Sequence, residues 1–366
     1  MGLLHVARAM AVVLSHLLTA ALAVTSYAGP SAQAQPAAQT DYSFDSRGVR
    51  LHGRLFTPAG RAPFPTVIYV TGGGNYSLLS DAYALNTVRA FNERGVAVYV
   101  FDKPGNGKSG GAFEVSNIGG KVRDTVAALD LMRTLPQVDQ RCMIVWALSA
   151  AGWYAPQAIN GRSDVCGLIL VSPAGDSPID WQGDVLLRRE LIRAGIGDRT
   201  TQDEAINLWA AQWRYQGTAE NYEAVRAQLE RAQRQPWYRA AFGTPQWKGL
   251  PETVDGLLPP DALRKAWQAS PADYEWQRDQ ANFADYTPVY RSVRQPVLLI
   301  FGDIDSLIDP AGSRAIFERV WAGRSDITVT TYAGAGHGIQ ARGDPENPMP
   351  AYLVQITDWS RARFGR

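Results

Sequence analysis

Two residues in this chain have local sequences that are typical of nucleophilic catalysis. Ser149 directly follows the apolar run Met143–Leu148 and precedes small residues and a helical pattern, which places it on a sharp strand-to-helix turn. A serine hydroxyl is a weak nucleophile until a base takes its proton. His337 lies in a glycine-rich loop after the last apolar run, whereas His52 is expected to be an exposed strand residue. The sequence therefore predicts Ser149 as nucleophile and His337 as its base.

An acid that orients the imidazole would complete such a site, and three aspartates follow the apolar run Val297–Phe301. We predict Asp305 as this acid, because it lies just beyond the strand and before the next helix. Asp303 and Asp309 are then expected to serve as turn and helix-capping residues. The chain order serine, aspartate, histidine differs from the orders found in chymotrypsin and subtilisin.

Backbone amides that could bind an oxyanion are expected at two places. The apolar run Thr66–Val70 ends in Thr71 and three glycines, whose bare backbone can approach a developing negative charge. A glycine run can equally form an ordinary turn. We predict the amide of Gly73 as one donor, with Gly74 as the next candidate, and the amide of Ala150 as the other donor.

The elements that would position these residues alternate between strands and helices. A hairpin with a tight turn at Arg47-Gly48 is expected near the start, and Lys121–Leu135 carries apolar residues along one helical face. Apolar runs typical of buried strands occur at Thr66–Val70, Val96–Phe101, Met143–Leu148, Gly167–Val171, Val297–Phe301 and Ile327–Tyr332. This alternation predicts an α/β fold with a doubly wound, mostly parallel sheet.

Residues 176–290 break the alternation, because their pattern is helical and aromatic with no strong strand. Seven of the 11 tryptophans lie there: Trp181, Trp209, Trp213, Trp237, Trp247, Trp267 and Trp276. We predict a helical lid or cap, in which most of these rings form the lid's own core and a few face a substrate. Residues 41–175 and 291–366 would then form the α/β core that contains the sheet.

The first 34 residues have the layout of a secretory signal peptide. Arg8 supplies a basic start, Ala9–Val24 is largely apolar, and an A-x-A site ends at Ala34. We expect cleavage after Ala34, or else after Ala28. An uncleaved anchor is the alternative, although an apolar run of about 16 residues is short for a membrane span. Residues 35–40 are predicted to be a linker, and the mature protein is predicted to be periplasmic or secreted with no stable membrane span.

Charge and cysteine content restrict the partners. The 36 basic and 35 acidic residues give no electrostatic reason to expect nucleic acid, so a small, roughly neutral substrate fits better. Cys142 and Cys166 each begin an apolar run and could be neighbours in a parallel sheet, either as a disulfide or as buried free thiols. Neither has metal-ligand spacing, and no metal or organic cofactor is expected.

Other nucleotide or acid-nucleophile chemistries do not fit the pattern. Gly107-Lys108-Ser109 resembles the end of a phosphate-binding loop, but Asp102 occupies the position where that motif needs glycine. The run Gly72–Gly74 lacks the spacing of a dinucleotide-binding fingerprint. A dehalogenase or epoxide hydrolase would need an acidic nucleophile where Ser149 stands.

Four segments together resemble motifs of the α/β-hydrolase superfamily, of the bacterial esterase and serine-aminopeptidase-like type. They are "FDKPGNGKSGG", "ALSAAGWYAP", "DYTPVYRSVRQPVLLIFGDIDSLIDP" and "GAGHGI", in the family's order. The resemblance covers residues 41–366 and is weakest in the lid. It implies an eight-stranded sheet and the roles assigned above. Ala147 and Ala151 depart from the family's elbow glycines, and Thr71 stands where many members carry histidine.

Together these features predict an exported serine hydrolase that cleaves carboxylic esters with an apolar part through an acyl-enzyme. A serine peptidase or aminopeptidase on the same fold is one alternative, since ester and amide hydrolysis share their early steps. A non-catalytic binding protein on a hydrolase scaffold is the other, since a fold does not dictate function.

Overall fold

The computed structural model describes residues 38–114 and 117–365. The signal peptide predicted for residues 1–34 lies outside the described residues. Within the described residues the central element is one eight-stranded sheet. Its strands in spatial order are β1 (Ala38–Ser46), β2 (Val49–Thr57), β4 (Ala97–Phe101), β3 (Phe64–Thr71), β5 (Val138–Leu148), β6 (Val165–Val171), β7 (Val297–Gly302) and β8 (Ile327–Tyr332).

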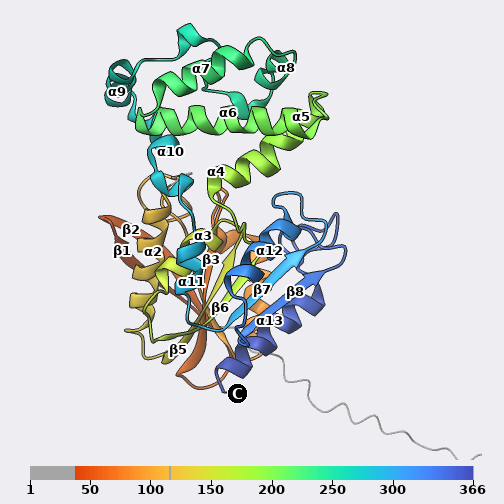
Figure 1. Ribbon diagram of the computed structural model, residues 1–366. Helices are drawn as coiled ribbons and strands as arrows, with labels where there is room; N and C mark the ends of the chain where they lie inside the picture. The colour runs from red at the N-terminus through yellow and green to blue at the C-terminus, as the bar shows by residue number, and fades with distance from the viewer. Residues whose placement is uncertain (1–37, 115–116, 366) are drawn as a thin grey trace, which may run out of the picture. The chain divides into compact units, whose positions relative to one another are not determined.

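The sheet is mostly parallel. Strand β2 is antiparallel to both β1 and β4, and every other neighbouring pair is parallel. Helices run beside the strands, as Figure 1 shows. The prediction of a doubly wound, mostly parallel sheet is therefore confirmed.

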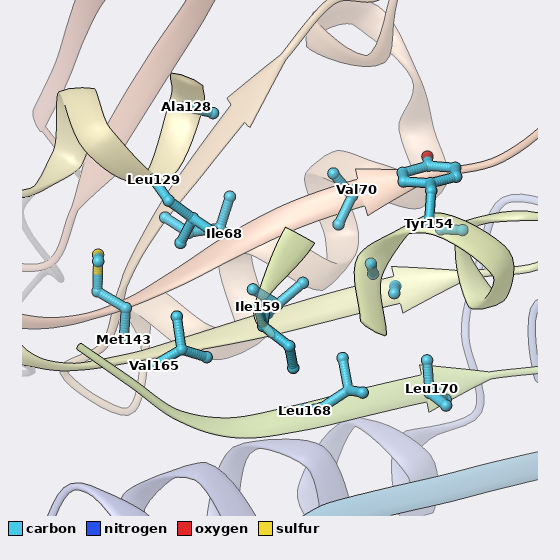
Figure 2. Close-up of a cluster of buried hydrophobic side chains, with 14 of the residues drawn as sticks. Ile68, Val70, Ala128, Leu129, Met143, Tyr154, Ile159, Val165, Leu168 and Leu170 are labelled. Atoms are coloured by element: carbon cyan, nitrogen blue, oxygen red, sulfur yellow. The ribbon is translucent and has the colours of Figure 1, made fainter. Parts of the chain in front are cut away.

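Alternate residues of the strands build two separate hydrophobic cores, one on each face of the sheet. In β3, Ile68 and Val70 belong to one core, whereas Val67 and Tyr69 belong to the other. Figure 2 shows the first of these cores, where Leu129 of the helix α2 lies over Ile68. Helices that contribute to the first core are α2 (Ile118–Met132), α3 (Ala151–Ala158), α11 (Thr287–Ser292) and α12 (Pro310–Val320), and those of the second are α1 (Ala82–Asn92) and α13 (Pro350–Arg363).

The N-terminal hairpin forms as predicted, with its turn at Arg47 and Gly48. Both turn residues have positive φ, 53° and 76°, which is the backbone of the two-residue turn that suits twisted strands. The linker prediction is wrong for residues 38–40. These residues pair with residues 55–57 of β2, so the strand begins at Ala38.

Residues between β6 and β7 form a helical insertion with its own hydrophobic cluster. Trp209 and Trp247 are fully buried in it, and four further tryptophans pack against it. Trp181 instead packs against the first core of the sheet. The helices of the insertion are α4 (Pro178–Trp181), α5 (Arg188–Arg193), α6 (Arg199–Thr218), α7 (Tyr222–Ala232), α8 (Tyr238–Phe242), α9 (Pro260–Ala269) and α10 (Glu275–Arg278), with short π and 3₁₀ turns between them.

The insertion ends earlier than the predicted boundary at residue 290. Helix α11 spans that boundary, and its Tyr290 is fully buried in the first core of the sheet. The Tyr290 ring lies 4.7 Å from the ring of Phe317 in α12, measured between centroids. Burial of this ring against the sheet explains why the chain has already returned to the core by α11.

Cys142 of β5 and Cys166 of β6 form a disulfide, with their Cα atoms 5.1 Å apart. The parallel pairing of β5 with β6 brings them together, because Met143 and Val165 are partners in the register. The structure thereby decides between the two states that the sequence left open.

Candidate active site

Ser149 occupies a strained turn between β5 and α3. Its φ is 61°, in the left-handed region that a non-glycine residue adopts at a cost of about 1–3 kcal/mol and that is concentrated at functional sites. Its amide donates to the carbonyl of Val171 at 2.9 Å, which ties the turn to the end of β6. The half-buried serine therefore lies at the carboxyl edge of the parallel strands, where such sheets bind ligands.

Small residues allow this turn to pack tightly. Ala147 and Ala151, which replace the glycines of the resembling motif, are both fully buried and fit their sites. A Cβ on Gly152 would lie 2.6 Å from the Cβ of Pro173, so glycine is required at position 152. Only one residue after the turn thus has a strict steric requirement for glycine.

The structure joins His337 and Asp305 directly. The imidazole Nδ1 lies 2.7 Å from Oδ2 of Asp305, whose side chain is 0% exposed. The other carboxylate oxygen, Oδ1, accepts from the amides of Leu307 at 2.7 Å and Ile308 at 3.3 Å. The carboxylate is therefore held from its own loop and presents one oxygen to the histidine.

The histidine loop and the acid loop support each other. The amide of Ile304 donates to the carbonyl of Ala335 at 3.1 Å, and Gly302 has no room for a side chain because this carbonyl lies against it. On the far side of His337, the hydroxyl of Tyr83 from α1 donates to the carbonyl of Gly338 at 2.7 Å. The backbone around His337 is thus anchored on both sides.

The two other aspartates have the structural roles predicted for them. Asp303 accepts from the amide of Gly334 at 2.7 Å in the turn, and Asp309 caps α12 by accepting from Ala311 at 3.1 Å. The prediction for His52 is wrong, because its side chain is only 11% exposed. It lies 3.5 Å from the carboxylate of Asp41 on the neighbouring strand, which covers it.

The glycine loop after β3 approaches the turn that carries Ser149. A Cβ on Gly72 would lie 2.6 Å from the Cα of Ala150, and the Gly72 amide donates to the carbonyl of Leu148 at 3.1 Å. The amides of Gly73 and Ala150 make no hydrogen bond with any residue that the structure describes. Two amides on adjoining loops are thus free to donate, as an oxyanion site requires.

Three residues that support this loop were not predicted as site residues. The Lys103 ammonium donates to the carbonyls of Gly73 at 2.8 Å and Gly74 at 2.7 Å. Asp102 accepts from the amide of Leu78 at 2.7 Å, and the Tyr154 hydroxyl donates to the carbonyl of Thr71. The available signal was a charged pair directly after a fully buried strand, in "FDKPGNGKSGG".

Ser149 and His337 themselves are not joined by a hydrogen bond in the structure described for residues 38–114 and 117–365. Catalytic hydrogen bonds are often long without substrate and shorten in the reacting complex. Within the same residues, no group of three or more metal-ligating side chains is arranged around a common point. None of the described helices combines the length and apolar character that crossing a bilayer needs.

Comparison with known proteins identifies the family. The model of the "Alpha/beta hydrolase family" matches residues 51–347, which include the three loops described above. The quorum-quenching protein AidA of Acinetobacter baumannii (strain MDR-ZJ06) is 29% identical over 150 residues, 40% of this chain and 48% of that protein. The chain therefore aligns with about half the length of this relative.

Solved structures share the fold at low identity. The Pyrococcus furiosus esterase Pf2001 has a TM-score of 0.52 and 14% identity, with 89% of this chain and 90% of that chain covered. Est1E of Butyrivibrio proteoclasticus, solved with ferulic acid bound, has a TM-score of 0.52 and 16% identity, with coverage of 89% and 100%. The match to the family model, together with this shared architecture, shows that the chain belongs to the alpha/beta hydrolase family.

Proposed function

We propose that the protein is a serine hydrolase that cleaves carboxylic esters through an acyl-enzyme intermediate. One observation carries the proposal: a fully buried Asp305 carboxylate holds His337 at the same sheet edge as the strained Ser149. Membership of the hydrolase family and esterases among the structural neighbours support the same reaction class.

In this mechanism His337 takes the proton of the Ser149 hydroxyl as its oxygen attacks the ester carbonyl. The amides of Gly73 and Ala150 bind the resulting oxyanion. The protonated imidazole then gives its proton to the leaving alcohol, and water repeats the sequence to release the acid. Asp305 accepts a hydrogen bond from the Nδ1–H group throughout, so that Nε2 is the atom that exchanges protons with the serine.

We also propose that the helical insertion acts as a lid over this site. Two of its side chains reach the acid loop: the Trp181 indole donates to the carbonyl of Leu307, and Arg189 donates to the carbonyl of Ser306, both at 2.6 Å. Trp181 also packs edge-on against Trp153, four residues after Ser149. The aromatic residues of the insertion favour an ester with an apolar acyl or alcohol part.

Export to the periplasm or the medium is part of the proposal. The leader pattern of residues 1–34 motivates it, and the disulfide between Cys142 and Cys166 supports it, because such bonds persist in oxidising compartments. Mass measurement of protein recovered from the periplasm should give the chain beginning at residue 35. Retention of the full leader in that fraction would contradict the proposed cleavage.

A fluorophosphonate probe tests the central claim, because it forms a stable adduct only with an activated serine. Intact mass should show one adduct on the wild type and none on Ser149→Ala. Ser172→Ala is the matched control: Ser172 follows the neighbouring strand, also at positive φ, but is fully buried, so its variant should keep the adduct. Loss of Ser149 should lower turnover by roughly 10⁴- to 10⁶-fold.

Substrate assays on the wild type distinguish an esterase from the two alternative functions. A panel of p-nitrophenyl esters of increasing acyl length, beside aminoacyl and peptide p-nitroanilides, separates an esterase from a peptidase. A wild type that forms no adduct and turns over neither class would contradict the proposed function and favour a non-catalytic binding protein.

A further inference from the structure

Lys103 is a buried cation directly behind the glycine loop. Lys103 is 7% exposed. It follows the fully buried strand β4, in a loop that is otherwise rich in glycine. Its ammonium donates two hydrogen bonds, both to loop carbonyls: Gly73 at 2.8 Å and Gly74 at 2.7 Å. The ammonium also lies 5.2 Å from the centre of the Tyr76 ring, which closes the loop. Among the described residues, Lys103 is thus a buried side chain whose two hydrogen bonds both go to the backbone of the glycine loop.

These two bonds determine where the loop's amides point. In a planar trans peptide the carbonyl and the amide of one unit point in opposite directions. Capture of the Gly73 carbonyl therefore turns the amide of Gly74 away from Lys103. The Tyr154 hydroxyl anchors the Thr71 carbonyl in the same way, and the partner amide of Gly72 bonds to β5.

The peptide that carries the Gly73 amide lies between these two anchored peptides. Glycine has a wide range of accessible backbone conformations, and Gly73 is exposed, with no atom near the position of a Cβ. Its amide direction is therefore determined by what holds its neighbours. Of the two anchors, only Lys103 lies on the C-terminal side of this peptide.

We propose that Lys103 is a positioning residue of the oxyanion site: its ammonium holds the carbonyls of Gly73 and Gly74 so that the Gly73 amide stays directed at the oxyanion formed on Ser149. This inference rests on the proposed function. Lys103 does not touch the substrate.

The environment of Lys103 makes its contact with the glycine loop sensitive to pH. Burial, assisted by the nearby charge of Lys121, lowers the pKa of Lys103 to about 8, while Asp102 opposes the shift. The ammonium is thus charged below this pH and loses its charge as the pH rises through it. The titratable groups that face it or share its cavity are Asp102, Tyr76, Lys121 and Asp124 of α2, Tyr69 of β3 and Tyr154 of α3.

The experiment compares Lys103→Met, which removes the charge and leaves an unbranched side chain one atom shorter, with Lys103→Arg, which keeps the charge. Lys108→Met is the matched control, since Lys108 lies in the same loop with its side chain 73% exposed. The substrate is p-nitrophenyl butyrate, and active sites are titrated with a fluorophosphonate so that kcat refers to competent molecules. We expect kcat to fall roughly 10- to 100-fold in Lys103→Met with KM nearly unchanged, because loss of one oxyanion donor costs about 10²–10³-fold and Lys103 acts through one. Lys108→Met should match the wild type.

The pH profile separates positioning from a merely structural role. Wild-type kcat should fall on the basic side with an apparent pKa near 8, following Lys103. In Lys103→Arg this fall should move to higher pH, because the guanidinium stays charged. The kcat of Lys103→Arg should also lie between that of Lys103→Met and that of the wild type. A basic limb that stays in place in Lys103→Arg would overturn the inference.

The remaining outcomes are also decisive. If Lys103→Met is folded by circular dichroism and keeps kcat per active site within about twofold of wild type, Lys103 does not position the amide. If Lys103→Met fails to fold, the wild-type and Lys103→Arg profiles decide. A wild type that neither forms the adduct nor turns over the ester overturns the proposed function together with this inference, whereas an active wild type with an unaffected Lys103→Met overturns this inference alone.

Discussion

Replacement of Asp305 by asparagine tests the proposed mechanism through a single proton. In the native protein Oδ1 of Asp305 accepts two backbone amides, and Oδ2 faces Nδ1 of His337 at 2.7 Å. Asparagine keeps one oxygen, and the two amides require that oxygen at the Oδ1 position. Its NH₂ group must then face Nδ1 of His337 and donate to it, which moves the imidazole proton to Nε2. A histidine in that tautomer cannot accept the proton of Ser149.

The expected loss in kcat for Asp305→Asn is on the order of 10⁴-fold, about 5.5 kcal/mol of transition-state stabilisation. The variant should stay folded, because it is isosteric and preserves both backbone hydrogen bonds. Initial rates with p-nitrophenyl butyrate, together with the rate of fluorophosphonate labelling, measure the effect. Both should fall by similar factors, since both reactions need the activated serine.

Asp303→Asn provides the control, because it makes the same chemical change two residues away. Asp303 accepts one backbone amide, from Gly334, and an asparagine oxygen can replace that acceptor. This variant should stay within a few-fold of wild type. An Asp305→Asn enzyme that keeps activity within tenfold of wild type would refute the assignment of Asp305 as the acid that sets the tautomer.

Three further predictions concern the loop, a buried acid and the disulfide. Gly72→Ala should lower kcat by roughly 10²-fold with a smaller change in stability, because its methyl group would displace the loop from Ala150. Ester kinetics and thermal melting measure the two effects, and unchanged kinetics would contradict the close approach of Gly72 to Ala150. Burial, reinforced by nearby carboxylates, raises the pKa of Asp176 to about 6, so the stability contributed by its protonated form is full below about pH 4 and is lost as the pH rises through 6. In denaturant unfolding, Asp176→Asn should lack this loss, and identical curves of unfolding free energy against pH for wild type and variant would exclude the shift. Denatured, unreduced protein should show no free thiol, since Cys142 and Cys166 are joined, and reduction should lower the free energy of unfolding by about 3 kcal/mol for their separation of 24 residues; two free thiols before reduction would rule the bond out.

Strand positions and the order of elements could be read from the chain because they depend on local hydrophobic pattern. The predicted run Ile327–Tyr332 coincides with β8, and Val297–Phe301 differs from β7 by one residue. The helix predicted for Lys121–Leu135 begins three residues earlier, at Ile118, because Asn117 caps it by accepting from the amide of Gly120. A cap is set by backbone geometry and is less visible than an apolar stripe.

The sequence by itself determined the α/β architecture, the family resemblance and the loops on which Ser149, Asp305 and His337 lie, since these follow from periodicity and short motifs. The tertiary structure alone decided that Cys142 and Cys166 are bonded and that Lys103 supports the glycine loop. Each of these contacts joins segments distant in sequence, and its existence depends on which strands become neighbours and on which side chains the fold buries. Local pattern suggested that the two cysteines could be neighbours but left their bonding open, because burial and hydrogen bonding between remote segments arise only when the whole sheet is assembled.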